Sequence, residues 1–146
     1  MHVAVVGPGE GGDLRVAEDV GRMLAERGAA IVCGGLGGVM EAACRGAKEA
    51  GGTTIGILPG ADRSAANPFV DVAIATGLGE ARNALVVRAA DAVIAVGGGY
   101  GTLSEIALAL KAGKRVAGID TWDIDGVIST PHAEAAVETV LRDFTT

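Results

Sequence analysis

The sequence is poor in aromatic residues and cysteines, and it contains no long apolar run. Only 3% of its 146 residues are aromatic, so a core must be built mainly from Ala, Val, Leu and Ile. No apolar run approaches the roughly 18 residues that a membrane-spanning helix needs. The amino terminus also lacks the basic region of a signal peptide. We therefore expect a cytoplasmic protein that does not engage a membrane.

Positive charge and metal-binding residues are scarce as well. The net charge is −6 and Lys and Arg form no cluster, which argues against nucleic acid as a partner. Cys33 and Cys44 suit a reducing compartment, and two cysteines make neither a disulfide framework nor a four-ligand zinc site. His2 and His132 lie far apart in the sequence, without the spacing of a metal motif. We predict no metal site.

Short apolar runs alternate with helical patterns along the whole chain. This alternation is typical of an α/β protein whose parallel sheet is covered by helices. We see no linker or repeat and predict a single domain over residues 1–146. Strands buried on both faces are expected at residues 3–6, 30–33, 54–58, 70–75, 92–96 and 116–119.

Five helices are expected around these strands. The first three cover residues 14–27, with Asp13 as the N-cap, 39–50 and 81–90. The fourth helix ends at Gly113, and the last begins with Thr130 as its cap and Pro131 at its first position. Apolar residues of the fourth helix follow the i, i+3, i+4, i+7 spacing at Leu103, Ile106, Ala107 and Leu110.

Glycine, by contrast, is abundant, at 24 of 146 residues, with no Gly-X-Y period. Many glycines gather in three loops, residues 7–12, 34–38 and 97–101, each between a predicted strand and a predicted helix. Such loops line the ligand crevice of an open parallel sheet. Glycine lets the backbone approach a ligand, and helix N-termini offer free N–H groups and partial positive charge. The loops favour phosphate binding; tight turns without a ligand are the alternative.

The first loop matches the G-x-G-x-x-G dinucleotide motif through Gly7, Gly9 and Gly12. A dinucleotide site also needs an acidic residue after the second strand, where this chain has Gly34 and Gly35. The NAD-linked interpretation is therefore disfavoured. No Walker motif occurs, which removes support for a P-loop ATPase.

The third loop leads into Thr102 and Glu105. Thr102 as a helix cap with Glu105 three residues later would form a capping box. Glu105 lies opposite the predicted apolar stripe, so it either faces solvent or faces the crevice. In the crevice, a carboxylate beside phosphate-binding N–H groups could hold a ribose hydroxyl, activate water or stabilise a cationic sugar transition state.

Arg82 and Asn83 fall in the first turn of the third predicted helix. A cation there opposes the helix dipole, and such a broken local rule often marks a functional site. We therefore predict an anion-binding role for Arg82. The alternative is a surface ion pair with Glu80.

These residues resemble a known family. The run GGGYGTLSEIALALKAGK, residues 97–114, is similar to the PGGxGTxxE signature of Lonely Guy type phosphoribohydrolases, long labelled lysine decarboxylases. Together with ARNALVVRAADAVIAVGGG and CGGLGGVMEAACRGAKEAGG, it resembles most the branch that includes molybdenum cofactor carrier proteins. The resemblance covers nearly the whole chain and implies a Rossmann-like three-layer sandwich that forms a homodimer or homotetramer.

The resemblance also implies roles for individual residues. Glu105 and Arg82 match the residues that serve in cleaving a nucleoside 5′-monophosphate to free base and ribose 5-phosphate. Phosphate would be bound by Gly98, Gly99, Gly101 and Thr102. Two positions depart from the hydrolases and resemble the carrier branch: their Arg-Lys pair is Arg82-Asn83 here, and the leading Pro of their signature is Gly97.

We therefore favour a binding protein for a phosphate-bearing nucleotide or pterin-type molecule, held at the carboxyl edge of the sheet without a required cofactor. The predicted ligand-binding residues are Gly7, Gly9, Gly34, Gly35, Asn83, Gly98, Gly99, Gly101 and Thr102. A phosphoribohydrolase using Glu105 and Arg82 is the alternative, and a scaffold with a vestigial site is a third. Lysine decarboxylation has little support, since the only lysines, Lys48, Lys111 and Lys114, are expected to be exposed.

Overall fold

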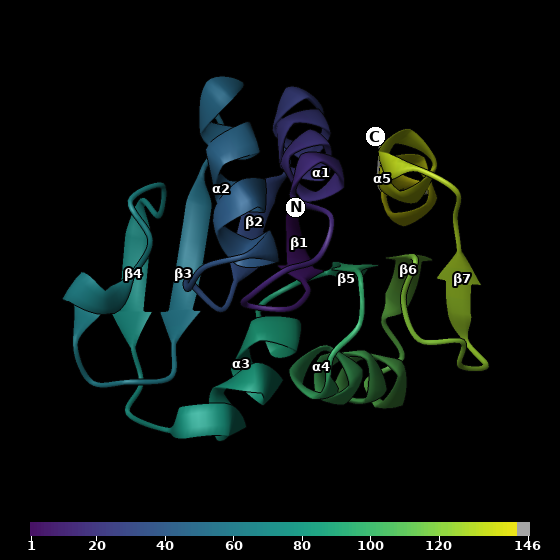
Figure 1. Ribbon diagram of the computed structural model, residues 1–146. Coiled ribbons are helices and arrows are strands. Elements are labelled where there is room, and N and C mark those ends of the chain that lie inside the picture. The colour runs from purple at the N-terminus through teal and green to yellow at the C-terminus, as the bar shows by residue number, and fades with distance from the viewer. Residues whose placement is uncertain (143–146) are drawn as a thin grey trace.

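A single sheet of seven strands runs through residues 1–142, which the computed structural model describes (Figure 1). The strands are β1 (His2–Val6), β2 (Ala30–Cys33), β3 (Thr54–Leu58), β4 (Val72–Ala75), β5 (Ala92–Val96), β6 (Arg115–Ile119) and β7 (Val127–Ser129). Their order is β4-β3-β2-β1-β5-β6-β7, and all neighbours are parallel. Residues 143–146 of the predicted domain lie outside the described residues, so its full extent stays a prediction.

Helices cover both faces of this sheet. They are α1 (Leu14–Glu26), α2 (Val39–Glu49), α3 (Arg82–Arg88), α4 (Tyr100–Lys111) and α5 (Ala133–Leu141). Helices α1, α2 and α5 lie on one face, and α3 and α4 lie on the other (Figure 1). The predicted α/β three-layer fold with a parallel sheet is confirmed. Within residues 1–142, none of the helices has the length and apolar character needed to cross a bilayer.

The core holds one large apolar cluster on each face of the sheet and a small third cluster of Cys33, Met40 and Cys44. Alternate residues of a strand point to opposite faces. Val3 and Val5 accordingly belong to the cluster beneath α1, α2 and α5, whereas Ala4 and Val6 belong to the cluster beneath α3 and α4. Both large clusters are rich in Ala and Val, as the scarcity of aromatic residues predicted.

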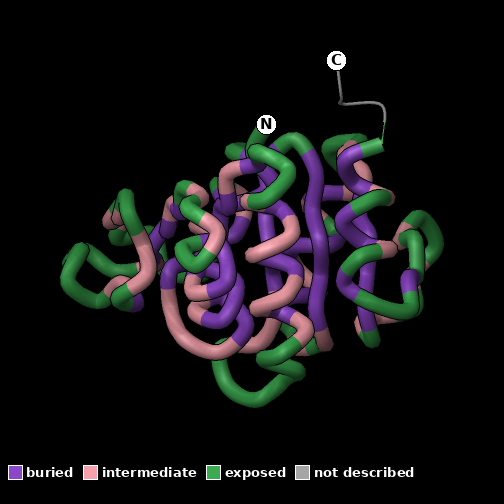
Figure 2. Tube along the Cα trace, turned by 90° about the horizontal axis from the view of Figure 1, so that it is seen from above, coloured by how far each residue is buried: buried purple, intermediate pink, exposed green. Residues whose placement is uncertain are grey.

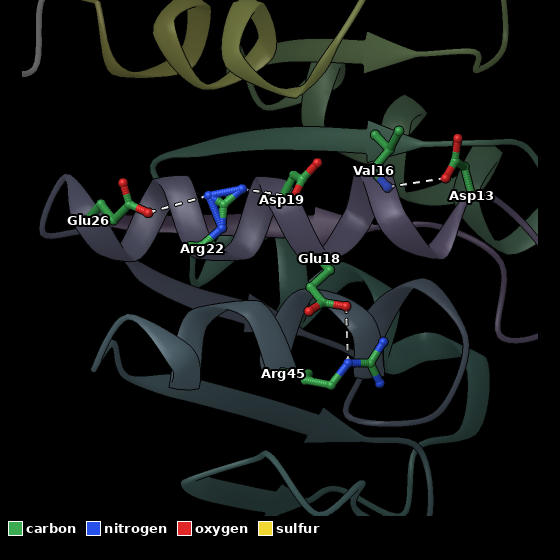
Figure 3. A network of polar contacts seen from close by, with 7 residues as sticks. All are labelled: Asp13, Val16, Glu18, Asp19, Arg22, Glu26 and Arg45. Atoms are coloured by element: carbon green, nitrogen blue, oxygen red, sulfur yellow. Dashed lines mark hydrogen bonds and ion pairs between the residues drawn. The ribbon is translucent and has the colours of Figure 1, made fainter.

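Two glycines within helices let α1 and α2 pack closely. A Cβ added at Gly21 would lie 1.9 Å from the Ala43 carbonyl oxygen, and one at Gly46 would lie 2.0 Å from the Glu18 carbonyl oxygen. The two helices are also joined by an ion pair, in which Arg45 Nε donates to a Glu18 carboxylate oxygen at 3.2 Å (Figure 3). Part of the glycine excess therefore serves helix packing and lies outside the three loops.

The edge strands differ from the prediction. Strand β4 begins at Val72 and not at residue 70. Two of its residues that were predicted to be buried are exposed, Val72 by 48% and Ile74 by 45%. The reason is its place at the sheet edge, where β3 is its only strand neighbour within residues 1–142. Strand β7, which we did not predict, forms the other edge. Figure 2 shows the same distribution, with buried segments at the centre and exposed turns around the margin.

The ends of the helices lie close to the predictions, except at the starts of α4 and α5. Asp13 is the N-cap of α1, as expected, since its carboxylate accepts a hydrogen bond from the Val16 backbone N–H at 3.1 Å (Figure 3). Helix α5 begins at Ala133, and Thr130 is not its cap. His132 takes that position, because its Nδ1 accepts from the Ala135 backbone N–H at 3.2 Å.

The strand order reverses at β1, and this reversal positions a crevice. The chain proceeds from β1 outward to β4 on one side and then returns to β5 on the other side of β1. In parallel sheets, the loops after two such strands lead to opposite faces and leave a crevice at the carboxyl edge. Here those are the loops after β1 and β5, two of the three glycine-rich loops.

Lys114 is half-buried rather than exposed. Its Nζ donates to the Val87, Arg88 and Ala90 carbonyl oxygens at the carboxyl end of α3, with 2.7 Å to Val87 and 3.1 Å to Arg88. A cation at this end of a helix satisfies its last carbonyl groups and interacts favourably with the helix dipole. The linker between α4 and β6 therefore secures the end of α3 opposite to Arg82.

Candidate anion-binding cavity

A cavity of about 380 Å³ opens where the loops after β1 and β5 diverge. Residues from these loops and from α3 and α4 line it. Most of the predicted site residues contribute, namely Gly7, Gly9, Arg82, Asn83, Gly99, Gly101, Thr102 and Glu105. The cavity thus gathers segments that are about 90 residues apart in the sequence.

The orientation of α4 directs two polar side chains inward. The buried residues of α4 are Thr102, Glu105, Ile106 and Ala109. They follow the same i, i+3, i+4, i+7 spacing as the stripe that we predicted, shifted by one residue along the chain. Ala107 of the predicted stripe is exposed. The helix is therefore rotated by about 100° from our expectation, and Glu105 lies on the buried face.

Thr102 does not form the predicted capping box. Helix α4 begins at Tyr100 with Gly99 as its N-cap, so Thr102 already lies inside the first turn. Its side chain is 2% exposed, and its Oγ1 has no hydrogen-bond partner. A buried hydroxyl without a partner costs free energy. Because Thr102 lines the cavity, a ligand oxygen there could supply the missing partner.

Arg82 reaches this cavity from the first turn of α3. Its Nη1 donates to Asn83 Oδ1, and its Nη2 lies 3.5 Å from the Gly34 carbonyl oxygen. Its Nε is buried without a hydrogen-bond partner. None of the ion pairs within 4.0 Å in residues 1–142 involves Arg82, so the alternative of a surface pair with Glu80 is wrong. The guanidinium keeps donor capacity for an anion.

Glu105 faces the same space as a nearly buried carboxyl group, 7% exposed. Burial penalises its charged form and raises its pKa to about 7, although the positive charge of Arg82 acts in the opposite direction. Near neutral pH the group is therefore divided between its acid and carboxylate forms. It can donate a hydrogen bond to a ligand or accept one from it.

Asn83 links the starts of α3 and α4. Its Nδ2 donates to Ser104 Oγ at 2.9 Å, and Ser104 Oγ donates to the Gly101 carbonyl oxygen at 2.7 Å. Its Oδ1 accepts from Arg82. Asn83 therefore fixes the direction of the guanidinium relative to the glycine loop at the start of α4.

The second glycine loop contributes Leu36 to the cavity lining and contacts Arg82 through Gly34. A Cβ at Gly34 would lie 2.6 Å from Arg82 Nη2, so glycine leaves room for the guanidinium. Asn67 holds this loop, since its Nδ2 donates to the Leu36 carbonyl oxygen at 2.9 Å and its backbone N–H donates to the Gly35 carbonyl oxygen at 2.9 Å. Gly34, Gly35 and Gly98 lie next to the cavity lining rather than in it.

Several residues of this region were not predicted from the sequence. Pro8, Leu36, Met40 and Tyr100 also line the cavity. Pro8, Leu36 and Tyr100 lie within the three glycine loops. Their place in these loops was a signal in the sequence that could have identified them as lining residues. Asn67 lies in the loop between β3 and β4, and no motif marks it in the sequence.

Trp122 is a further residue of this region that the sequence did not indicate. Its Nε1 donates to the Gly99 carbonyl oxygen at 3.0 Å. Its ring also packs against the cluster beneath α3 and α4. Its place after β6 puts it at the carboxyl edge of the sheet, where it also secures the third glycine loop.

The fold and cavity define a Rossmann-like α/β protein with a polar, glycine-rich site at the switch point of its sheet. A family model described as the SLOG cluster4 family matches residues 1–143, and the chain belongs to this family. This membership confirms the predicted resemblance to the Lonely Guy superfamily.

Known structures place the chain near carrier proteins within that superfamily. The molybdenum cofactor binding protein from Rippkaea orientalis is 40% identical, with a TM-score of 0.93 over 99% of this chain and 97% of that one. The molybdenum cofactor carrier protein from Chlamydomonas reinhardtii is 36% identical, with a TM-score of 0.87 over 99% and 98%. The predicted likeness to the carrier branch is thus confirmed.

A similarity to a hydrolase is more limited. The rice (Oryza sativa subsp. japonica) protein named probable cytokinin riboside 5′-monophosphate phosphoribohydrolase LOGL5 is 35% identical over 103 residues. The match covers 68% of this chain and 42% of the rice protein. The chain therefore corresponds to less than half the length of that relative.

Proposed function

We propose that the cavity at the carboxyl edge binds a small molecule that carries a phosphate, of the nucleotide or pterin type. The observation that carries this proposal is the Thr102 hydroxyl, which is buried against the cavity without a hydrogen-bond partner. The names of the carrier proteins similar to this chain add support for a pterin-type cargo such as the molybdenum cofactor.

Three kinds of donor converge on the proposed phosphate position. The first turn of α4 presents backbone N–H groups, and its N-cap, Gly99, has no side chain to occupy them. Thr102 adds its hydroxyl and Arg82 its charge. Hydrogen bonds to charged partners contribute about 1.5–3 kcal/mol each, so this set suits a dianion better than a neutral ligand.

Calorimetric titration with AMP, ribose 5-phosphate and molybdopterin tests the proposal. We expect Arg82→Ala to weaken binding by about 10- to 100-fold and Thr102→Val by about 10-fold. Arg88→Ala is the matched control, because Arg88 lies on the exposed surface at the other end of α3. Absence of binding by all three ligands to the unaltered chain would refute the proposal.

The alternative function is cleavage of the N-glycosidic bond of a nucleoside 5′-monophosphate. The buried Glu105 beside Arg82 favours it, because a carboxyl group with a pKa of about 7 can exchange a proton at neutral pH. The C1′–N bond would break, a water oxygen would bond to C1′, and the proton from water would pass to the leaving base. The products would be free base and ribose 5-phosphate.

Release of adenine from AMP separates hydrolysis from binding alone. A carrier should bind AMP and release no adenine. If adenine is released, Glu105→Gln should abolish release while leaving the phosphate contacts of Arg82 and Thr102 in place. Unchanged turnover in Glu105→Gln would exclude Glu105 as the catalytic residue.

We also propose that the protein is located in the cytoplasm. Cys33 and Cys44 are buried free thiols whose sulfur atoms lie 3.6 Å apart. Such a close pair is expected to stay reduced in the cytosol, where disulfides are rare.

A further inference from the structure

The chain places its single tyrosine, which lines the cavity, next to its single tryptophan. Tyr100 is the first residue of α4 and is 84% exposed, the highest value among the exposed large hydrophobic residues of the described chain. Its ring centroid lies 6.1 Å from that of Trp122. In a sequence with 3% aromatic residues, this placement calls for a reason beyond core packing.

Trp122 is held in place by a hydrogen bond and supports the ring of Tyr100. The indole Nε1 is bonded to the Gly99 carbonyl oxygen, and the Tyr100 ring is tilted by 31° against the indole. Tyr100 is therefore supported by a neighbour that is itself attached to the glycine loop. Most of its ring surface remains open to solvent.

Tyr100 also stands where two cavities meet. The second cavity, of about 530 Å³, lies between α3 and α4 and shares Asn83, Tyr100 and Gly101 with the first. Its other lining consists of the apolar side chains Ala81, Ala84 and Leu108 together with Glu80 and Ser104. The first cavity thus contains the buried polar groups of Arg82, Thr102 and Glu105, whereas the second is the more apolar of the two, and Tyr100 lines both.

We propose that Tyr100 and the adjoining groove between α3 and α4 bind the planar heteroaromatic ring of the ligand, whose phosphate lies in the first cavity. This inference rests on the proposed function. It assigns the ligand class as a purine- or pterin-like ring joined to a phosphate by a linker that passes Asn83 and Gly101. Planar heteroaromatic rings stack on aromatic side chains, and the stacking tolerates different rings because each presents a π-face.

Binding of AMP, ribose 5-phosphate and adenosine to variants of the full chain tests this assignment. AMP should bind at least about 5-fold more tightly than ribose 5-phosphate, which lacks the ring. Tyr100→Ala should weaken AMP binding by about 5- to 100-fold and leave ribose 5-phosphate binding within about 2-fold. Tyr100→Phe is the matched control and should retain AMP affinity, because it keeps the ring.

Fluorescence of the single tryptophan supplies a second measurement. Adenosine, which has the ring without the phosphate, should change the Trp122 emission in the unaltered chain and in Arg82→Ala. The change should disappear in Tyr100→Ala. Circular dichroism on each variant verifies that the fold is intact.

The outcomes separate this inference from the proposed function. If ribose 5-phosphate binds but AMP binds no more tightly, or if Tyr100→Ala weakens both ligands equally, the ring subsite is wrong and the phosphate site stands. If neither binds, both proposals fall. If Tyr100→Ala changes only the oligomeric mass, Tyr100 serves an interface between copies, and the ring assignment is overturned.

Discussion

Glu105 links the site to the stability of the whole fold. Its pKa is raised to about 7 from the ordinary value of 4.5, chiefly by burial, so the folded chain holds this proton more tightly than the unfolded chain does. A proton held more tightly in the folded state contributes stability that is present below about pH 4.5. This contribution is lost as the pH rises towards 7. Arg82 and Cys33 are the charged and titratable neighbours that interact with the carboxyl group.

We expect Glu105→Gln to remove this pH dependence. The difference in free energy of unfolding between variant and unaltered chain should shift by about 3 kcal/mol in favour of the variant between pH 4.5 and 8. Urea denaturation at several pH values measures it. Glu134→Gln, at an exposed glutamate of α5, is the control. A difference that stays constant with pH would contradict the buried protonated state.

At the scale of single residues, some members of the candidate site could be predicted from the sequence and others could not. Arg82 and Asn83 were found because a cation in the first turn of a helix breaks a local rule. The burial of Thr102 and Glu105 was not found, because polar residues at buried positions cannot be told from exposed ones by hydropathy. Asn67 was not found either, because its side chain holds the second glycine loop through a hydrogen bond to Leu36, which lies 31 residues away in the sequence. No local sequence pattern indicates such a contact.

At the scale of elements, strands and helices were predictable because buried parallel strands and capped helices have strong local signatures. The rotation of α4 was not, because two overlapping stripes on this helix have the same spacing. Leu103 and Leu110 are only partly buried, while the stripe that contains the two polar residues faces inward. The two buried polar residues of the candidate site therefore concealed the true buried stripe of α4 from an analysis of hydropathy.

Helix α3 depends on a residue outside it. Lys114→Met removes the ammonium that satisfies the last carbonyl groups of α3, so we expect a loss of about 1–3 kcal/mol of stability, measured by urea denaturation. Arg82 lies at the other end of this seven-residue helix, so ligand affinity should fall as well. Lys111→Met is the matched control, since Lys111 is exposed on α4. Equal stability of both variants would show that the cap contributes nothing.

At the scale of the whole molecule, the chain is expected to assemble. Several large apolar side chains are exposed in residues 1–142, including Val72 and Ile74 at one sheet edge and Leu78 and Leu85 near α3. We predict a homodimer or homotetramer, so light scattering should give two or four times the 14.4 kDa mass of one chain. A mass of 14.4 kDa at micromolar concentration would contradict assembly.

The reversal of strand order at β1 also has a consequence for biosynthesis. Strands β1 to β4 leave the ribosome first, and they carry only the loop after β1 and the supporting loop after β2. The free edge of β1 has no partner until β5 has been made, and the cavity is completed only with Thr102 and Glu105 of α4. A nascent chain can fold much of its sheet while it still lacks the groups that would hold a ligand, so the proposed ligand would be captured only after β5 and α4 have been made.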